Sequence, residues 1–133
     1  MRIGIISNDV VPDFGLPCSG NGIRVMGLYQ GLKLNGCDAT ILMDINMIRN
    51  RRKSWGDHVG NAAPDYVKIY NHLTANESVF DEFDYLISCN WAAISALPEF
   101  VISNINLVYD FFSPTMIESE YYKNDQEISV ALG

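Results

Sequence analysis

The chain has 133 residues, of which 48% are hydrophobic and 19% charged, a balance that fits one folded domain and excludes a disordered or coiled-coil protein. Sixteen acidic against nine basic residues give a net charge of -7, so we expect no nucleic-acid partner. No apolar stretch approaches the ~20 residues of a membrane span, and the first residues do not resemble a secretion signal. Three cysteines without a Cys-x-x-Cys pair are typical of free thiols, which predicts a cytoplasmic protein.

Short apolar runs alternate with helical patterns along the chain. We expect strands at residues 3–7, 39–43, 66–70, 85–89 and 105–109. We expect helices at residues 21–34, 77–83, 91–97 and 115–122. Residues 44–65 have mixed charge, two glycines and a proline, and are predicted to form a loop with at most one helical turn. The alternation predicts a single α/β, Rossmann-like three-layer domain with a parallel sheet of about five strands.

The helix expected at residues 21–34 has Asn21 as its candidate N-cap and Asn35-Gly36 as its stop. One of its faces is apolar and consists of Val25, Leu28, Tyr29 and Leu32. Gly27 and Gly31 each weaken a helix by roughly 1 kcal/mol relative to alanine. We therefore expect them to let this helix approach the sheet or a neighbouring element closely.

The segment Ser19-Gly20-Asn21-Gly22-Ile23-Arg24 opens this helix, at the carboxyl end of the first expected strand. Free N–H groups and the positive end of the helix dipole would converge at Gly20, Asn21 and Gly22, which predicts a site for a phosphate or carboxylate. Arg24, one turn into the helix, would add a charge-assisted contact. A simple turn with a solvated arginine explains the same letters, and spacing alone does not separate the two interpretations.

Two nucleotide-binding motifs can be compared with this segment. Gly15 and Gly20 have the outer spacing of a P-loop, but Asn21-Gly22 stands where lysine and serine or threonine are needed, which excludes an ATPase of that kind. Gly20-x-Gly22 begins a dinucleotide fingerprint, and Asp44 lies where an acid would hold a ribose. Val25 replaces the third small residue, and the loop before Gly20 is too long, so an NAD-binding domain is a distant alternative.

Longer stretches of the chain resemble a known family. "MRIGIISNDVVPDFGLPCSGNGIRVMGLYQGLKLNGCDATIL" is similar to the opening of retaining GT-B glycosyltransferases of family four, with a first strand, a glycine-containing loop, an arginine, a helix and a second strand. "FDYLISCNWAAISALP" and "INLVYDFFSPTMIE" resemble that family's fourth and fifth strands with their following loops.

This resemblance implies the N-terminal, acceptor-side domain of an enzyme that transfers a sugar from a UDP- or GDP-sugar to a glycan, lipid-linked or other acceptor, without a metal. The donor diphosphate would lie near Gly20, Asn21, Gly22 and Arg24. The second, nucleotide-binding domain of the family has no counterpart within residues 1–133, so the resemblance also implies a fragment that is inactive alone. The acceptor would meet the loops after the strands, at Asp9, Asn90, Trp91, Asp110, Phe111 and Phe112.

Each acceptor-side residue also has a plain structural interpretation. Asp110 is the candidate catalytic residue, which would orient or deprotonate an acceptor hydroxyl, but it could equally cap the turn before Pro114. Asp9 admits the same two interpretations. Asn90 and Trp91 could stack on a sugar, or could be a helix cap and a core tryptophan.

The remaining candidates are basic or imidazole side chains. Arg49, Arg51, Arg52 and Lys53, followed by Trp55, could contact an anionic membrane surface, or could be a solvated charge run. His58 and His72 have no partner at metal-ligand spacing, and surface loop positions explain them. The contrasting hypothesis for the whole chain is a non-catalytic α/β module that binds a small ligand or a protein.

Overall fold

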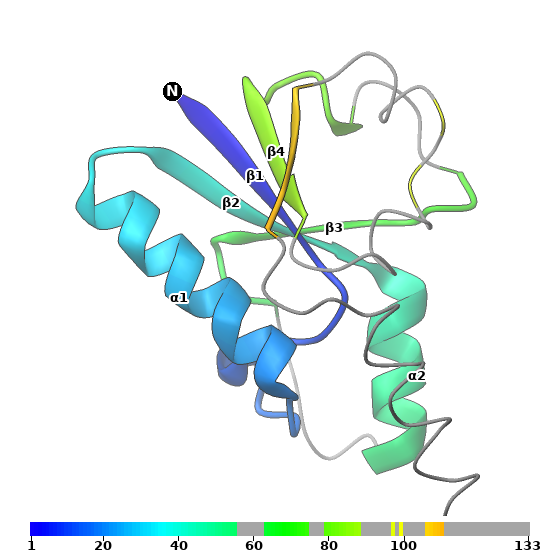
Figure 1. Cartoon of the computed structure of the whole chain (residues 1–133). Helices are drawn as coiled ribbons and strands as arrows, with labels where there is room; N and C mark the ends of the chain where they lie inside the picture. Colours follow the sequence, from blue (N-terminus) through cyan, green and yellow to red (C-terminus); the bar gives the residue numbers. More distant parts are fainter. Residues whose placement is uncertain (56–62, 75–78, 89–96, 98, 100–105, 111–133) are drawn as a thin grey trace, which may run out of the picture.

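A computed structural model of the chain describes residues 1–55, 63–74, 79–88, 97, 99 and 106–110. Five parallel strands form one sheet in the order β3-β2-β1-β4-β5 (Figure 1). The strands are β1 (Arg2–Ser7), β2 (Asp38–Asp44), β3 (Val67–Tyr70), β4 (Tyr85–Ser88) and β5 (Leu107–Tyr109). The expected α/β fold with a five-stranded parallel sheet is confirmed. The central strands β1 and β2 are mostly buried, as continuous apolar runs predict, whereas the edge strands β3 and β5 are partly exposed.

In the first 55 residues, two helices and one 3₁₀ turn follow β1 and β2 along the chain. These are η1 (Pro12–Phe14), α1 (Gly20–Leu34) and α2 (Ile45–Trp55). In Figure 1, α1 runs back along the sheet, whereas α2 begins where β2 ends and extends beyond the carboxyl edge. None of the helices in the described ranges is long and apolar enough to cross a membrane.

The sheet separates two apolar clusters. The first lies under α1, where Val25 packs with Ile5 and Ile41 from the central strands and with Phe14 from η1. The second lies on the opposite face, where Phe80 and Phe83 pack with Leu42 and Leu86. Because residues of β1 and β2 alternate between the two clusters, the middle of the sheet is buried on both sides.

The helix α1 starts one residue earlier than expected, and its cap is Ser19, so the assignment of the N-cap to Asn21 was wrong. Ser19 has extended backbone angles, and its Oγ accepts a hydrogen bond from the backbone N of Asn21 at 3.2 Å. The expected stop is confirmed: Gly36 adopts φ of +79°, and its backbone N donates to the carbonyl of Lys33.

The helix α2 corrects a second expectation, since residues 44–65 were predicted to form a loop. Asp44 accepts a hydrogen bond from the backbone N of Asn46 at 3.2 Å, which is the bond of a helix N-cap. Ile48 is the buried residue that anchors the helix on the first apolar cluster. Its few apolar residues are nevertheless placed with the periodicity of an amphipathic helix, a signal that the prediction of a loop overlooked.

Two further expectations for helices can be compared with the structure. Of the short helix expected at residues 77–83, the described part from residue 79 onward forms turns rather than an α-helix. The helices expected at residues 91–97 and 115–122 fall almost wholly outside the described residues. Among the described residues, Gly27 and Gly31 make no close approach, since a Cβ at either position would have none of them within 4 Å; the sheet itself does not require glycine there.

Candidate functional site

The carboxyl edge of the sheet is the natural place for a ligand. From β1 the chain first adds β2 and β3 on one side, and it later adds β4 and β5 on the other side. In sheets of this kind, ligands bind outside the carboxyl ends of the strands at such a reversal, which here lies between β1 and β4. The described segments at this edge are the loop after Ser7, the start of α1 and Asp110.

Asp9 is the most strongly held residue at this edge. Its side chain is 2% exposed, and its carboxylate accepts bonds from the backbone N of Val10 at 2.8 Å and of Ser19 at 2.6 Å. Nε of Arg51, from α2, donates to the same carboxylate at 2.7 Å. Asp9 therefore ties the first loop, the start of α1 and α2 together.

These contacts also decide the charge of Asp9. Burial alone would raise the pKa of the carboxyl, but the hydrogen bonds from Ser19, Arg51 and Val10 outweigh it and lower the pKa below its usual value of 3.8. The Asp9 carboxylate is therefore an anion whose charge is already compensated by groups of the protein. Of its two interpretations, this geometry favours the structural one.

Gly20 and Gly22 flank Asn21 directly but have different surroundings. A Cβ at Gly22 would lie 2.1 Å from the carbonyl oxygen of Val10, so glycine is needed there for α1 to pack against the first loop. A Cβ at Gly20 would have nothing within 4 Å among the described residues. The backbone at Gly20 is thus the open part of the predicted anion site, and Gly22 has a packing role.

The expected anion site is partly filled by the protein itself. The backbone N of Ser19 is bonded to Asp9, and that of Asn21 to Oγ of Ser19. A ligand anion would therefore meet the outer side of this helix start, at Gly20 and Arg24.

Arg24 and Asp110, which are 86 residues apart, meet at this outer side. Nε and Nη2 of Arg24 donate to the two carboxylate oxygens of Asp110 at 2.6 and 2.9 Å. The arginine and aspartate side chains are 43% and 21% exposed, and the backbone N of Asp110 also bonds to the carbonyl of Ser88. The structure thus brings together the candidate diphosphate-binding cation and the candidate catalytic carboxylate, in the bidentate geometry that also suits a phosphate.

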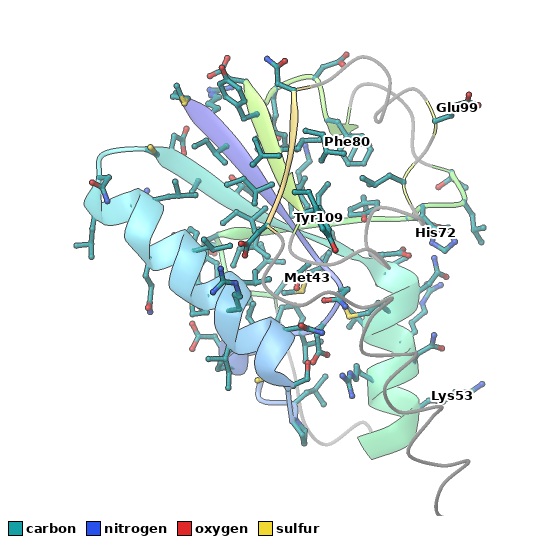
Figure 2. The ribbon with its side chains drawn as sticks, viewed as in Figure 1. Met43, Lys53, His72, Phe80, Glu99 and Tyr109 are labelled. Carbon is teal, nitrogen blue, oxygen red and sulfur yellow. The ribbon has the colours of Figure 1, made fainter. Side chains whose placement is uncertain are left out.

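The basic residues after β2 lie on α2 and not in a loop, which corrects that part of the expectation. Arg51 turns inward to Asp9, whereas Arg49 and Lys53 are exposed and lie four residues apart, hence on one face of the helix. Figure 2 shows Lys53 pointing away from the sheet. The basic run is therefore divided between an internal ion pair and an outward face; the side chain of Arg52 lies outside the described part.

Asp44 and His72 form a second polar group that sequence reasoning did not connect. The Asp44 carboxylate accepts from Nδ1 of His72, from the backbone N of His72 at 3.3 Å, and from both nitrogens of Asn46. With both oxygens occupied, Asp44 is a poor partner for the two hydroxyls of a ribose, which argues against the dinucleotide alternative. The signal in the sequence was that Asp44 directly follows one expected strand and His72 comes two residues after another, and such strands end at one edge.

One buried atom at the same edge lacks a partner. Oδ1 of Asn8, in the loop after β1, is buried without a hydrogen bond among the described residues. Buried polar atoms are satisfied in most proteins, so an orphan at the end of the central strand suits contact with a ligand or an ordered water. Its neighbours in the sequence give Asn8 no motif that would predict such a role.

Four predicted acceptor-side residues, Asn90, Trp91, Phe111 and Phe112, lie outside the described residues. Within the described ranges, no group of three or more histidine, cysteine, aspartate or glutamate side chains is arranged to hold a metal ion. Comparisons with family models, curated proteins and solved structures found no match for this chain.

Proposed function

We propose that this chain is the acceptor-side domain of a glycosyltransferase that takes a sugar from a nucleotide diphosphate sugar. The observation that carries the proposal is the bidentate pair of Arg24 and Asp110 beside the open backbone of Gly20. This pair places a cation and a carboxylate outside the carboxyl ends of a parallel sheet, where such a substrate would enter.

In this proposal Arg24 acts on the donor substrate and Asp110 acts on the acceptor substrate. The Arg24 guanidinium, assisted by the N-terminus of α1, binds the donor diphosphate and stabilises the negative charge that grows on it as the sugar bond breaks. Binding of the diphosphate draws Arg24 away from Asp110. The released carboxylate then accepts a hydrogen bond from the acceptor hydroxyl and orients it toward the sugar.

The proposal includes the partners that the resemblance implies. A second domain would supply the nucleotide-binding half of the cleft, and the acceptor would be a glycan or a lipid-linked molecule. Arg49 and Lys53, on the exposed face of α2, would contact anionic lipid if the acceptor is held in a membrane.

The test is donor hydrolysis by the polypeptide that the natural reading frame containing these 133 residues encodes. We expect one member of a panel of UDP- and GDP-sugars to release its nucleotide diphosphate slowly in the absence of acceptor. Arg24→Ala should reduce that rate about 100-fold, the usual effect of removing one charge-stabilising group. Lys33→Ala, at the far end of the same helix, is the matched control and should keep the rate.

Two results would contradict the proposal. One is the absence of release from every donor. The other is equal rates for the Arg24 and Lys33 variants, which would show that the charge at the start of α1 has no part in donor binding.

A further inference from the structure

The second polar group at the carboxyl edge has a defined geometry. Asp44 is the last residue of β2 and is paired in register with Tyr70, the last residue of β3. His72, two residues after Tyr70, therefore lies beside Asp44. Figure 2 shows His72 near the start of α2. Nδ2 of Asn46 lies 3.0 Å from Oδ1 of Asn71 and 3.0 Å from Oδ1 of Asp44, which connects the start of α2 to the turn after β3.

These contacts fix which ring nitrogen of His72 carries the proton. Nδ1 of His72 contacts Oδ2 of Asp44 and lies 3.3 Å from Nδ2 of Asn46. The two hydrogens of that Asn46 nitrogen are used by Oδ1 of Asp44 and Oδ1 of Asn71, so we assign Nδ1 as the donor to Asp44, because a carboxylate oxygen accepts hydrogen bonds. In the neutral ring, Nε2 then has an unshared electron pair. Nε2 makes no hydrogen bond with any described residue, and the His72 side chain is 32% exposed. The outer nitrogen is therefore an oriented acceptor that faces solvent at the edge of the sheet.

The surroundings narrow the kind of ligand that suits this acceptor. The negative charge of Asp44 lies directly behind the ring, which disfavours an anion. Metal binding is disfavoured because the described residues near it provide no set of three metal-ligating side chains. Tyr70 is buried, and burial together with the charge of Asp44 raises the pKa of its phenol, so it adds no second charge. A neutral hydrogen-bond donor, such as a hydroxyl group, matches this nitrogen acceptor.

We infer that His72 and Asp44 form a subsite for a polyhydroxylated ligand, in which Nε2 of His72 accepts a hydrogen bond from a ligand hydroxyl. The inference rests on the proposed function in one respect, since it identifies this ligand as the sugar part of the acceptor. Asp44 is the positioning residue, and His72 touches the ligand.

The first experiment measures the tautomer of His72 by long-range ¹H–¹⁵N correlation spectra of the 133-residue chain. We expect the proton on Nδ1 in the parent protein. Asp44→Asn retains the N-cap of α2, because asparagine caps as well as aspartate. Its side-chain NH₂ now faces the ring, so the proton should move to Nε2. A parent protein with the proton on Nε2 would overturn the inference.

The second experiment titrates the same chain with methyl α-glucopyranoside, methyl α-galactopyranoside and methyl α-mannopyranoside, with the amides of Asn46 and Asn71 as reporters. At least one glycoside should give saturable shifts. His72→Asn retains a donor to Asp44 where Nδ1 stands but lacks the outer nitrogen, so it should weaken that binding at least tenfold while leaving the urea midpoint unchanged. The Asp44→Asn variant should weaken binding as well.

The outcomes separate this inference from the proposed function. Absence of shifts with all three glycosides, or equal binding by the parent and His72→Asn proteins, would overturn the subsite even if donor hydrolysis is observed. Saturable binding that depends on His72, without hydrolysis of any donor, would support the subsite and contradict the transferase.

Discussion

The carboxyl edge has two parts that look alike in the sequence and differ in the structure. The inner junction, which consists of Asp9, Ser19, Gly22 and Arg51, is packed and hydrogen-bonded. The outer rim, which consists of Gly20, Arg24, Gly27 and Asp110, is open to solvent. Each part contains at least one glycine and one arginine–aspartate pair. The difference is the burial of the carboxylate, since the side chain of Asp9 is 2% exposed and that of Asp110 is 21% exposed: the pair is structural where its carboxylate is shielded from water and is suited to ligand exchange where water has access.

The largest effect is expected at Asp9. Its replacement by alanine leaves the backbone N–H groups of Val10 and Ser19 without their acceptor and removes the partner of Arg51. Breaking a buried ion pair costs about 3–5 kcal/mol, and we expect about 3–4 here because Arg51 is 36% exposed. Urea unfolding measures the loss. Asp38→Ala breaks the exposed pair with Arg2 and should cost less than about 0.5 kcal/mol.

The same residue predicts a pH dependence. Because the pKa of Asp9 is lower in the folded protein than its usual 3.8, its ionisation favours folding at pH values above 3.8, and this contribution is lost as the pH falls through the folded pKa. The difference in unfolding free energy between the parent and Asp9→Asn proteins should thus be constant above about pH 5 and shrink in more acidic solution. A difference that grows with acidification would contradict the assigned direction.

A smaller effect is expected from the glycines. Gly22→Ala places a Cβ against the backbone of Val10 and should destabilise the protein by about 2–3 kcal/mol. Gly27→Ala adds the same methyl group to the same helix in open space and should stabilise it by up to about 1 kcal/mol. Thermal unfolding of the two variants measures both. Equal signs for the two would mean that α1 does not pack on the first loop as described.

The smallest effect is expected at the outer rim. A double-mutant cycle of Arg24→Ala and Asp110→Ala should give a coupling free energy of unfolding below about 1 kcal/mol, because both side chains are partly solvated. The variants should retain the native circular dichroism spectrum. A coupling above about 2 kcal/mol would place this pair with the inner junction and weaken its assignment to ligand binding.

The strands could be predicted from the sequence because the pattern that identifies each one lies within its own few residues. Each of the five contains a short run of apolar residues, and every strand in the structure overlaps the expected range. The helix α2 was not predicted in the same way. Its stability depends on the Asp44 cap and on the contact of Arg51 with Asp9, which lies 42 positions earlier in the chain.

The sequence predicted where the candidate site lies, at the carboxyl edge of the sheet, but it did not predict the contacts of the individual residues there. That the loops after the strands would gather at one edge followed from the parallel order, and Arg24 and Asp110 do meet there. The different roles of Gly20 and Gly22 depend on the position of the Val10 carbonyl, and the bond between Asp44 and His72 depends on the register of β2 and β3. Neither can be deduced without tertiary coordinates.

The central position of β1 has a consequence for synthesis. Within this chain β1 is translated before every other strand, yet one of its hydrogen-bonding edges is filled by β4, where Ile3 pairs with Tyr85. Until Ser88 has left the ribosome, the nascent chain exposes an apolar strand with an unpaired edge, a form that attracts chaperones and favours aggregation.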